Sequence, residues 1–103
     1  MPAPDQPKVF GAPVGQPVRI LLRARKDNWI QVRDGEQVIA ERLLHQGDTY
    51  RVPDRPGLVL RTGNGAGLEI EVDGKKAPSL GAAVRRNVQL DPALLAAGQA
   101  VAD

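Results

Sequence analysis

Three glycines at alternate positions, Gly63, Gly65 and Gly67 in the stretch RTGNGAGLEI, could form a phosphate cradle. A dinucleotide-binding loop needs the spacing G-x-G-x-x-G between a strand and a helix, because the helix N-terminus must face the pyrophosphate. Here the spacing is shorter, and residues 68–73 alternate apolar and acidic side chains as a strand does. No Lys-Ser/Thr pair follows, which excludes a P-loop. The glycines therefore predict a hairpin loop between two strands.

The other side chains that could act in catalysis are few. The only histidine, His45, lies in a predicted turn. The only serine, Ser79, lies in APSLG, which is not the strand-to-helix elbow of the hydrolases. The chain has no cysteine, which excludes a thiol nucleophile, a disulfide and a thiolate metal site. We therefore expect no metal and no cofactor.

Two carboxylates are enough for a glycosidase, and Glu69 and Glu71 share one face of a predicted strand. The first predicted strand, however, carries Arg19, Arg23 and Arg25 on its own outer face. Cross-strand ion pairs are the simpler explanation for such carboxylates. The sequence therefore indicates a protein that is not an enzyme.

Charge and hydropathy narrow the class of partner. The 103 residues include 14 Lys+Arg and 12 Asp+Glu, for a net charge of +2, and the two signs are interleaved. This pattern indicates a mixed, solvated surface rather than a concentrated basic footprint. No run approaches the roughly twenty apolar residues that cross a bilayer, and no apolar signal-peptide core is present. We expect the chain to begin inside a longer protein, with any targeting segment upstream.

Alternating apolar and polar side chains dominate the middle of the chain. In VRILLRAR, residues 18–25, every second side chain is apolar, as in a strand with one buried face. The seven predicted strands are 18–25, 29–33, 36–44, 49–52, 58–62, 68–73 and 84–90. Seven short strands at this spacing predict an all-β fold, an antiparallel β-sandwich or barrel.

Two Asp-Gly dipeptides mark turns between these strands. Asp34-Gly35 and Asp73-Gly74 are strong hairpin signals, because the turns that match the twist of paired strands need φ > 0. Residues 26–28, KDN, form a further predicted turn.

The N-terminal segment has a different composition from the domain that follows. Residues 1–17 contain five prolines and are predicted to be the end of an extended linker. Val9 and Phe10 are its apolar exceptions, and we expect them to dock onto the domain. The β-sandwich domain itself is predicted to cover residues 18–90.

The C-terminal part carries two local signals. In the last strand, Arg86 has the parity of the inward side chains, so it would point into the core unless a β-bulge shifts the register. Residues 91–103 are predicted to form a short helical turn and a tail, because Asp91 can cap a helix that starts at Pro92.

One face of the second strand is the candidate for partner recognition. Trp29, Gln31 and Arg33 share this face, and we expect Arg23 to lie nearby on the preceding strand. Trp and Arg are the side chains that most often dominate the energetics of an interface. Two other interpretations stay open. In the first, Trp29 is a structural residue that packs under a loop or the N-terminal segment. In the second, the arginines and Trp29 form a groove for single-stranded nucleic acid.

Several motifs resemble the C-terminal domain of RodZ-type proteins of Gram-negative bacteria. The similar pieces are WIQVRD at residues 29–34, GNGAGLEIEVDG at residues 63–74 and the terminal LG and VQLDP. The resemblance covers about residues 18–95. The segment LGAAVRRNV is shorter than its counterpart in the family.

The resemblance implies a function that composition and spacing do not reach. RodZ-type proteins carry a cytoplasmic helix-turn-helix domain that binds the actin-like MreB filament, one transmembrane helix, a Pro-rich linker and a periplasmic β domain. They link the cytoskeleton to cell-wall elongation and maintain rod shape. The resemblance therefore implies a non-catalytic periplasmic domain of a membrane-anchored protein, whose partners are proteins of the elongation machinery.

A contact of this kind can use a β surface or an exposed sheet edge, and edge strands also permit self-association. Two alternatives belong to other classes. The first alternative is a domain that binds glycan or peptidoglycan directly. The second is a basic nucleic-acid-binding module.

Overall fold

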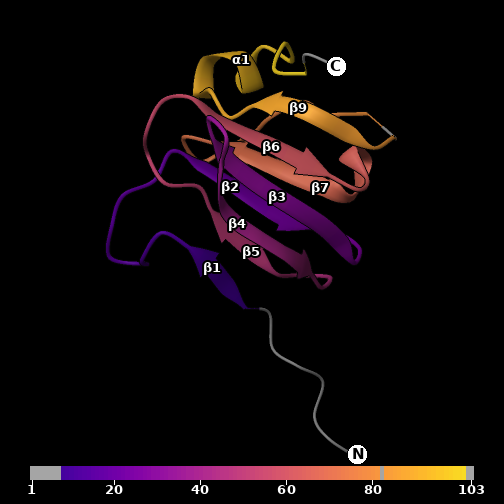
Figure 1. Ribbon diagram of the computed structural model, residues 1–103, viewed down its shortest axis with the longest axis horizontal. Helices are drawn as coiled ribbons and strands as arrows, with labels where there is room; N and C mark the ends of the chain where they lie inside the picture. The colour runs from indigo at the N-terminus through magenta and orange to yellow at the C-terminus, as the bar shows by residue number, and fades with distance from the viewer. Residues whose placement is uncertain (1–7, 82, 102–103) are drawn as a thin grey trace, which may run out of the picture.

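The computed structural model describes residues 8–81 and 83–101 and shows two β-sheets with one short helix near the C-terminus (Figure 1). The elements are β1 (Val9–Gly11), β2 (Ile20–Ala24), β3 (Asn28–Asp34), β4 (Gln37–Leu44), β5 (Thr49–Arg51), β6 (Leu58–Thr62), a 3-10 turn (Gly65–Gly67), β7 (Leu68–Val72), β8 (Lys75–Lys76), β9 (Arg85–Gln89) and α1 (Pro92–Ala96). The strand orders are β1-β5-β2-β7-β8 and β4-β3-β6-β9. The predicted all-β fold is confirmed. No helix in the described part of the chain is long and apolar enough to span a bilayer.

The core is the layer between the two sheets, because alternate side chains of each strand point into it. In β2, Leu22 and Ala24 are buried while Arg23 between them is exposed. In β3, Ile30 and Val32 are buried in the same way. The largest fully buried side chains come from both sheets and include Leu22, Ile30, Leu44, Leu58, Leu60, Ile70 and Val88. Each large aliphatic side chain contributes about 2 kcal/mol of transfer free energy when buried.

The two Asp-Gly signals correspond to the two hairpins within a sheet. Between β3 and β4, Asp34 pairs with Gln37, and Gly35 in the connection has a φ of +62°. Between β7 and β8, Asp73 and Gly74 have φ of +52° and +81°. The β7–β8 turn has positive φ at both central residues, whereas the β3–β4 turn, whose central residues are Gly35 and Glu36, has it at Gly35 alone; both patterns belong to the tight turns that match the twist of paired strands. Both hairpin predictions are therefore confirmed.

The glycine-rich loop is a turn, as predicted, but it is not a hairpin loop. It follows β6 in one sheet and precedes β7 in the other, so it carries the chain across the core. The glycines serve close packing: a Cβ on Gly65 would lie 2.4 Å from the carbonyl oxygen of Gly81, and one on Gly67 would lie 2.9 Å from Nδ2 of Asn28. The Asn64 side chain caps the turn by accepting a hydrogen bond from the Ala66 N–H.

The N-terminal segment joins the first sheet. Val9 and Phe10 belong to β1, which pairs with β5 in parallel, so the predicted docking of these residues is confirmed. The buried carboxylate of Asp48 accepts a hydrogen bond from the Lys8 N–H at 2.9 Å. Arg51 then donates to the carbonyl oxygen of Ala12, at 3.2 Å, in the segment that follows. Residues 1–7 of the predicted linker lie outside the described residues.

The C-terminal part forms the predicted short helix, and the last strand contains the β-bulge that the parity of Arg86 had left open. Residues 102–103 of the predicted tail lie outside the described residues. The pairing of β6 with β9 shifts register between Leu60 and Thr62, and this irregularity leaves Arg86 exposed rather than buried. Asp91 caps α1 by accepting hydrogen bonds from two backbone N–H groups. Leu95 is buried in the core cluster, which fixes the helical turn on the sandwich.

Candidate functional site

The outer surface of the second sheet gathers the predicted recognition residues Trp29, Gln31 and Arg33. They alternate with the buried residues of β3, and the register places side chains of β4 and β6 beside them. We call this surface the Trp29 face and define it as Trp29, Gln31, Arg33, Val38, Glu41, Leu43, Val59 and Arg61.

The Trp29 face combines exposed apolar groups with arginines. Trp29 is half-buried, and the guanidinium carbon of Arg61 lies 5.8 Å from the centre of its ring. Leu43, directly opposite Trp29 on β4, is 49% exposed, and Val38, opposite Arg33, is 45% exposed. Trp29 is not part of the core cluster of the described residues. Its ring therefore belongs to a surface, with a cation–π contact to an arginine of the next strand.

The arginines of this face have no acidic partner on the described residues. Arg33 donates through Nη2 to the Asn87 side-chain oxygen at 3.2 Å, and its Nε is buried without a hydrogen-bond partner in the described part of the chain. Glu41, the nearest carboxylate by register, accepts a hydrogen bond from Gln31 at 3.3 Å instead. Neither Arg33 nor Arg61 forms an ion pair with a carboxylate of residues 8–81 and 83–101. The Trp29 face therefore presents positive charge that carboxylates of a partner protein can pair with.

The structure does not bring Arg23 to this face, so this part of the site prediction is wrong. Arg23 lies on the outer surface of the other sheet, opposite Thr49 on one side and Glu69 on the other. The reason is that the turn at residues 26–28 crosses between sheets instead of forming a hairpin. One of the predicted ion pairs occurs on that outer surface, where Arg25 Nη1 lies 3.9 Å from Glu69 Oε2, whereas Arg19 pairs with Asp73 instead.

The sheet edges carry features that oppose pairing with another chain. The edge strands β1 and β8 have three and two residues, and both residues of β8 are lysines. The β9 edge is bridged by Val101. The longest edge, β4, has a register irregularity, and its Arg42 guanidinium lies 3.6 Å from the centre of the Phe10 ring. Short strands, lysines, bulges and covered edges all blunt edge-to-edge association. These edges therefore give little support to the predicted self-association.

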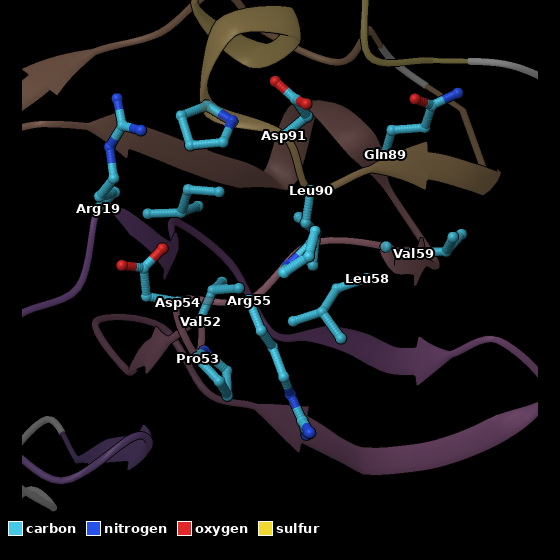
Figure 2. Close-up of a pocket in the computed structure, with 14 residues that line it drawn as sticks. Arg19, Val52, Pro53, Asp54, Arg55, Leu58, Val59, Gln89, Leu90 and Asp91 are labelled. Carbon is cyan, nitrogen blue, oxygen red and sulfur yellow. The ribbon is translucent and has the colours of Figure 1, made fainter.

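A pocket lies at one end of the sandwich and was not predicted (Figure 2). Its volume is about 460 Å³, and residues 19–20, 52–59 and 89–92 line it. These segments are far apart in the sequence, so no local pattern indicates that they meet. We call this cavity the end pocket.

Of the residues considered for catalysis, Glu69 and Glu71 share the outer face of β7, whereas His45 and Ser79 lie in separate connections. His45 is exposed, with Nδ1 3.5 Å from Asp27 Oδ2. The Ser79 hydroxyl accepts a hydrogen bond from the Gly81 N–H, a local turn contact. No group of three His, Cys, Asp or Glu side chains that could hold a metal ion occurs within residues 8–81 and 83–101. Phe10 lies opposite Tyr50 in the pairing of β1 with β5, but Tyr50 is buried and Trp29 belongs to the other sheet, so the three aromatic residues form no exposed stacking series for sugars or bases.

Comparison with known proteins adds one finding. A family model described as the RodZ C-terminal domain matches residues 22–89, which is more than half of the chain. No curated protein and no solved structure matches the chain significantly.

Proposed function

This chain belongs to the RodZ C-terminal domain family, and we propose that it acts in the periplasm as the protein-contacting domain of a membrane-anchored cell-shape protein. Its parent protein then links the MreB filament to the cell-wall elongation machinery, as the family resemblance implies. The domain contributes a rigid β surface at the end of a tether and carries out no chemistry of its own.

The observation that carries this proposal is the composition of the Trp29 face. Trp29 and Arg61 are in contact, Leu43 beside them is half exposed, and Arg33 has no acidic partner among the described residues. Aromatic residues and arginine are enriched at protein interfaces, and a few such side chains carry most of the binding free energy. The blunted edges favour a face over strand addition as the mode of contact.

The proposal is tested in cells that produce the full-length parent protein with a photo-crosslinking residue at position 31. We expect this position to crosslink to a protein of the elongation machinery. The control is position 23, on the outer surface of the other sheet, where we expect no such product. Equal crosslinking at both positions would show that the Trp29 face has no special role.

Trp29→Ala supplies the second arm. We expect it to abolish the crosslink and rod shape while the free energy of unfolding of the domain changes by less than about 1 kcal/mol, because the ring is only half-buried. A large loss of stability would instead assign Trp29 a structural role.

A further inference from the structure

The end pocket has the size and lining of a binding site. Its volume of about 460 Å³ falls in the range of small-ligand pockets. The floor consists of the buried side chains of Ile20, Val52, Leu58 and Leu90. Three prolines in the wall restrict the backbone, so the shape is largely formed before anything binds. The pocket therefore offers an apolar, preformed surface.

Both arginines at the rim of the pocket have their charge compensated by residues outside it. Arg19 donates through Nε and Nη2 to the two carboxylate oxygens of Asp73, at 2.9 and 2.8 Å. Arg55 Nη1 lies 3.5 Å from Asp34 Oδ2, and Figure 2 shows its side chain running away from Asp54 and Asp91. Neither Asp73 nor Asp34 lines the pocket. The arginines therefore do not make it an anion site.

Two carboxylates at the rim, those of Asp54 and Asp91, form no ion pair within the described residues, although the charge of Arg19 attracts both of them. Asp54 is exposed and makes no hydrogen bond or ion pair with the rest of the described chain. Asp91 accepts two backbone hydrogen bonds, from Ala93 and Leu94, but both go to Oδ1. The second oxygen of Asp91 is therefore open to a ligand. The end pocket thus combines an apolar floor with two open carboxylates at its rim, and Arg19, the arginine that attracts them, is held by Asp73.

We propose that the end pocket binds the side chain of a lysine presented by a partner protein. The aliphatic stem of lysine lies on the apolar floor, and its ammonium group reaches the rim, which is how long cationic side chains divide between apolar and polar surroundings. The three N–H donors of an ammonium point in different directions and can meet two separate carboxylates. The planar fork of arginine matches one carboxylate better. This site does not depend on the Trp29 face being an interface.

The first test is an NMR titration of the 103-residue chain with n-hexylammonium, which has a lysine-like stem and charge. We expect saturable shifts of the Val52, Leu58 and Leu90 methyl resonances with a Kd in the millimolar range. The controls are n-hexanol, which is neutral, and hexanoate, which is an anion. We expect binding in the order hexylammonium, hexanol, hexanoate. Equal binding of hexanol and hexylammonium, or no saturable shift of these methyl groups, would overturn the proposal.

Charge-removing variants then locate the ammonium group. Asp54→Asn and Asp91→Asn are each expected to weaken hexylammonium binding about threefold, the effect of an exposed ion pair. Asparagine keeps the helix cap at position 91, so the fold is retained. The matched control is Glu36→Gln at the exposed tip of the β3–β4 hairpin, which should leave the Kd unchanged. Unchanged binding in the Asp54→Asn, Asp91→Asn double variant would refute the assignment.

A peptide experiment separates a lysine side chain from a free amine. The blocked tripeptide Gly-Lys-Gly is expected to displace hexylammonium from the pocket methyl groups. The same peptide with an ε-acetylated lysine should not, because acetylation removes the charge. If the unmodified peptide fails to compete, the pocket accepts small amines only and the lysine proposal is wrong.

Discussion

The side-chain amide of Asn28 and the backbone of Asn64 exchange two hydrogen bonds, with Nδ2 donating to the Asn64 carbonyl oxygen at 2.7 Å and Oδ1 accepting from the Asn64 N–H at 3.1 Å. Oδ1 also accepts from the buried hydroxyl of Thr62 at 3.0 Å. Asn28 begins β3, and Asn64 lies between β6 and β7. The buried amide of Asn28 thus links the connection between β2 and β3 to the connection between β6 and β7, both of which cross from one sheet to the other.

Asn28→Ala is expected to lower the free energy of unfolding by about 2–3 kcal/mol, because it leaves buried donors and acceptors without partners. Urea unfolding of the variant measures this change. The control is Asn87→Ala on the exposed side of β9, which should change stability by less than about 0.5 kcal/mol. Similar values for the two variants would show that the amide network contributes little.

Two glycines of the same loop should respond differently to an added methyl group. A Cβ on Gly65 would lie 2.4 Å from the Gly81 carbonyl oxygen, whereas the nearest atom to a Cβ on Gly63 is 3.6 Å away. We expect Gly65→Ala to destabilise the domain by about 1–3 kcal/mol through overpacking. Gly63→Ala should be neutral or slightly stabilising. Thermal unfolding of the pair tests this, and equal melting temperatures would contradict it.

Stability should fall at acidic pH through Asp48. Burial raises the pKa of this carboxyl group, but the N–H groups of Lys8 and His45 donate to it, at 2.9 and 3.0 Å, and the net pKa is below the ordinary value. A lowered pKa contributes stability that is present above the unfolded pKa, about 3.9, and is lost as the pH falls through the folded pKa. We therefore expect the free energy of unfolding to decrease below about pH 4.

Asp48→Asn should make this dependence shallower, as measured by denaturant unfolding across the acidic range. Asp73→Asn is the comparison. The hydrogen bond from Arg19 also lowers the pKa of Asp73, but the side chains of Arg19 and Asp73 are both exposed, so we expect a smaller effect on stability. If Asp73→Asn reduces the pH dependence of the free energy of unfolding more than Asp48→Asn does, the role assigned to the buried carboxylate of Asp48 is refuted.

The β4 edge offers a test of how the domain avoids self-association. We expect Arg42→Val to favour dimers or larger species, because it removes a charge that lies over Phe10 and leaves an apolar edge strand. Sedimentation velocity of the variant and of Arg23→Val, on the other sheet, measures the difference. If both variants sediment as the parent chain does, Arg42 has no protective role.

Local signals were enough to predict seven of the strands and the two Asp-Gly hairpins. The alternation in residues 18–25 predicted β2, and the parity of Arg86 left two possibilities, an inward arginine or a β-bulge, of which the structure has the bulge. Two short strands were missed. The segment of β1 is rich in proline, and β8 consists of two lysines. Neither strand is long enough to show the alternation of apolar and polar side chains that indicates a strand.

The arrangement of strands in space could not be predicted in this way. A turn such as residues 26–28 looks the same whether the next strand joins its neighbour or crosses to the other sheet. For this reason Trp29 was placed correctly on its strand face, but Arg23 was assigned to the wrong surface. The end pocket was missed for a related reason, because its lining comes from three separate segments.

The repeated crossing between sheets also determines when the domain can fold. The chain changes sheet between β2 and β3, β4 and β5, β5 and β6, β6 and β7, and β8 and β9. The partner of β2 on one side is β7, and the second sheet is complete only when β9 arrives at Arg85–Gln89. Forming such distant pairings costs chain entropy before the new contacts compensate for it. All-β domains dominated by these pairings typically fold in milliseconds to seconds. We therefore expect the sandwich to form in one late cooperative step, once β9 is available to complete the second sheet.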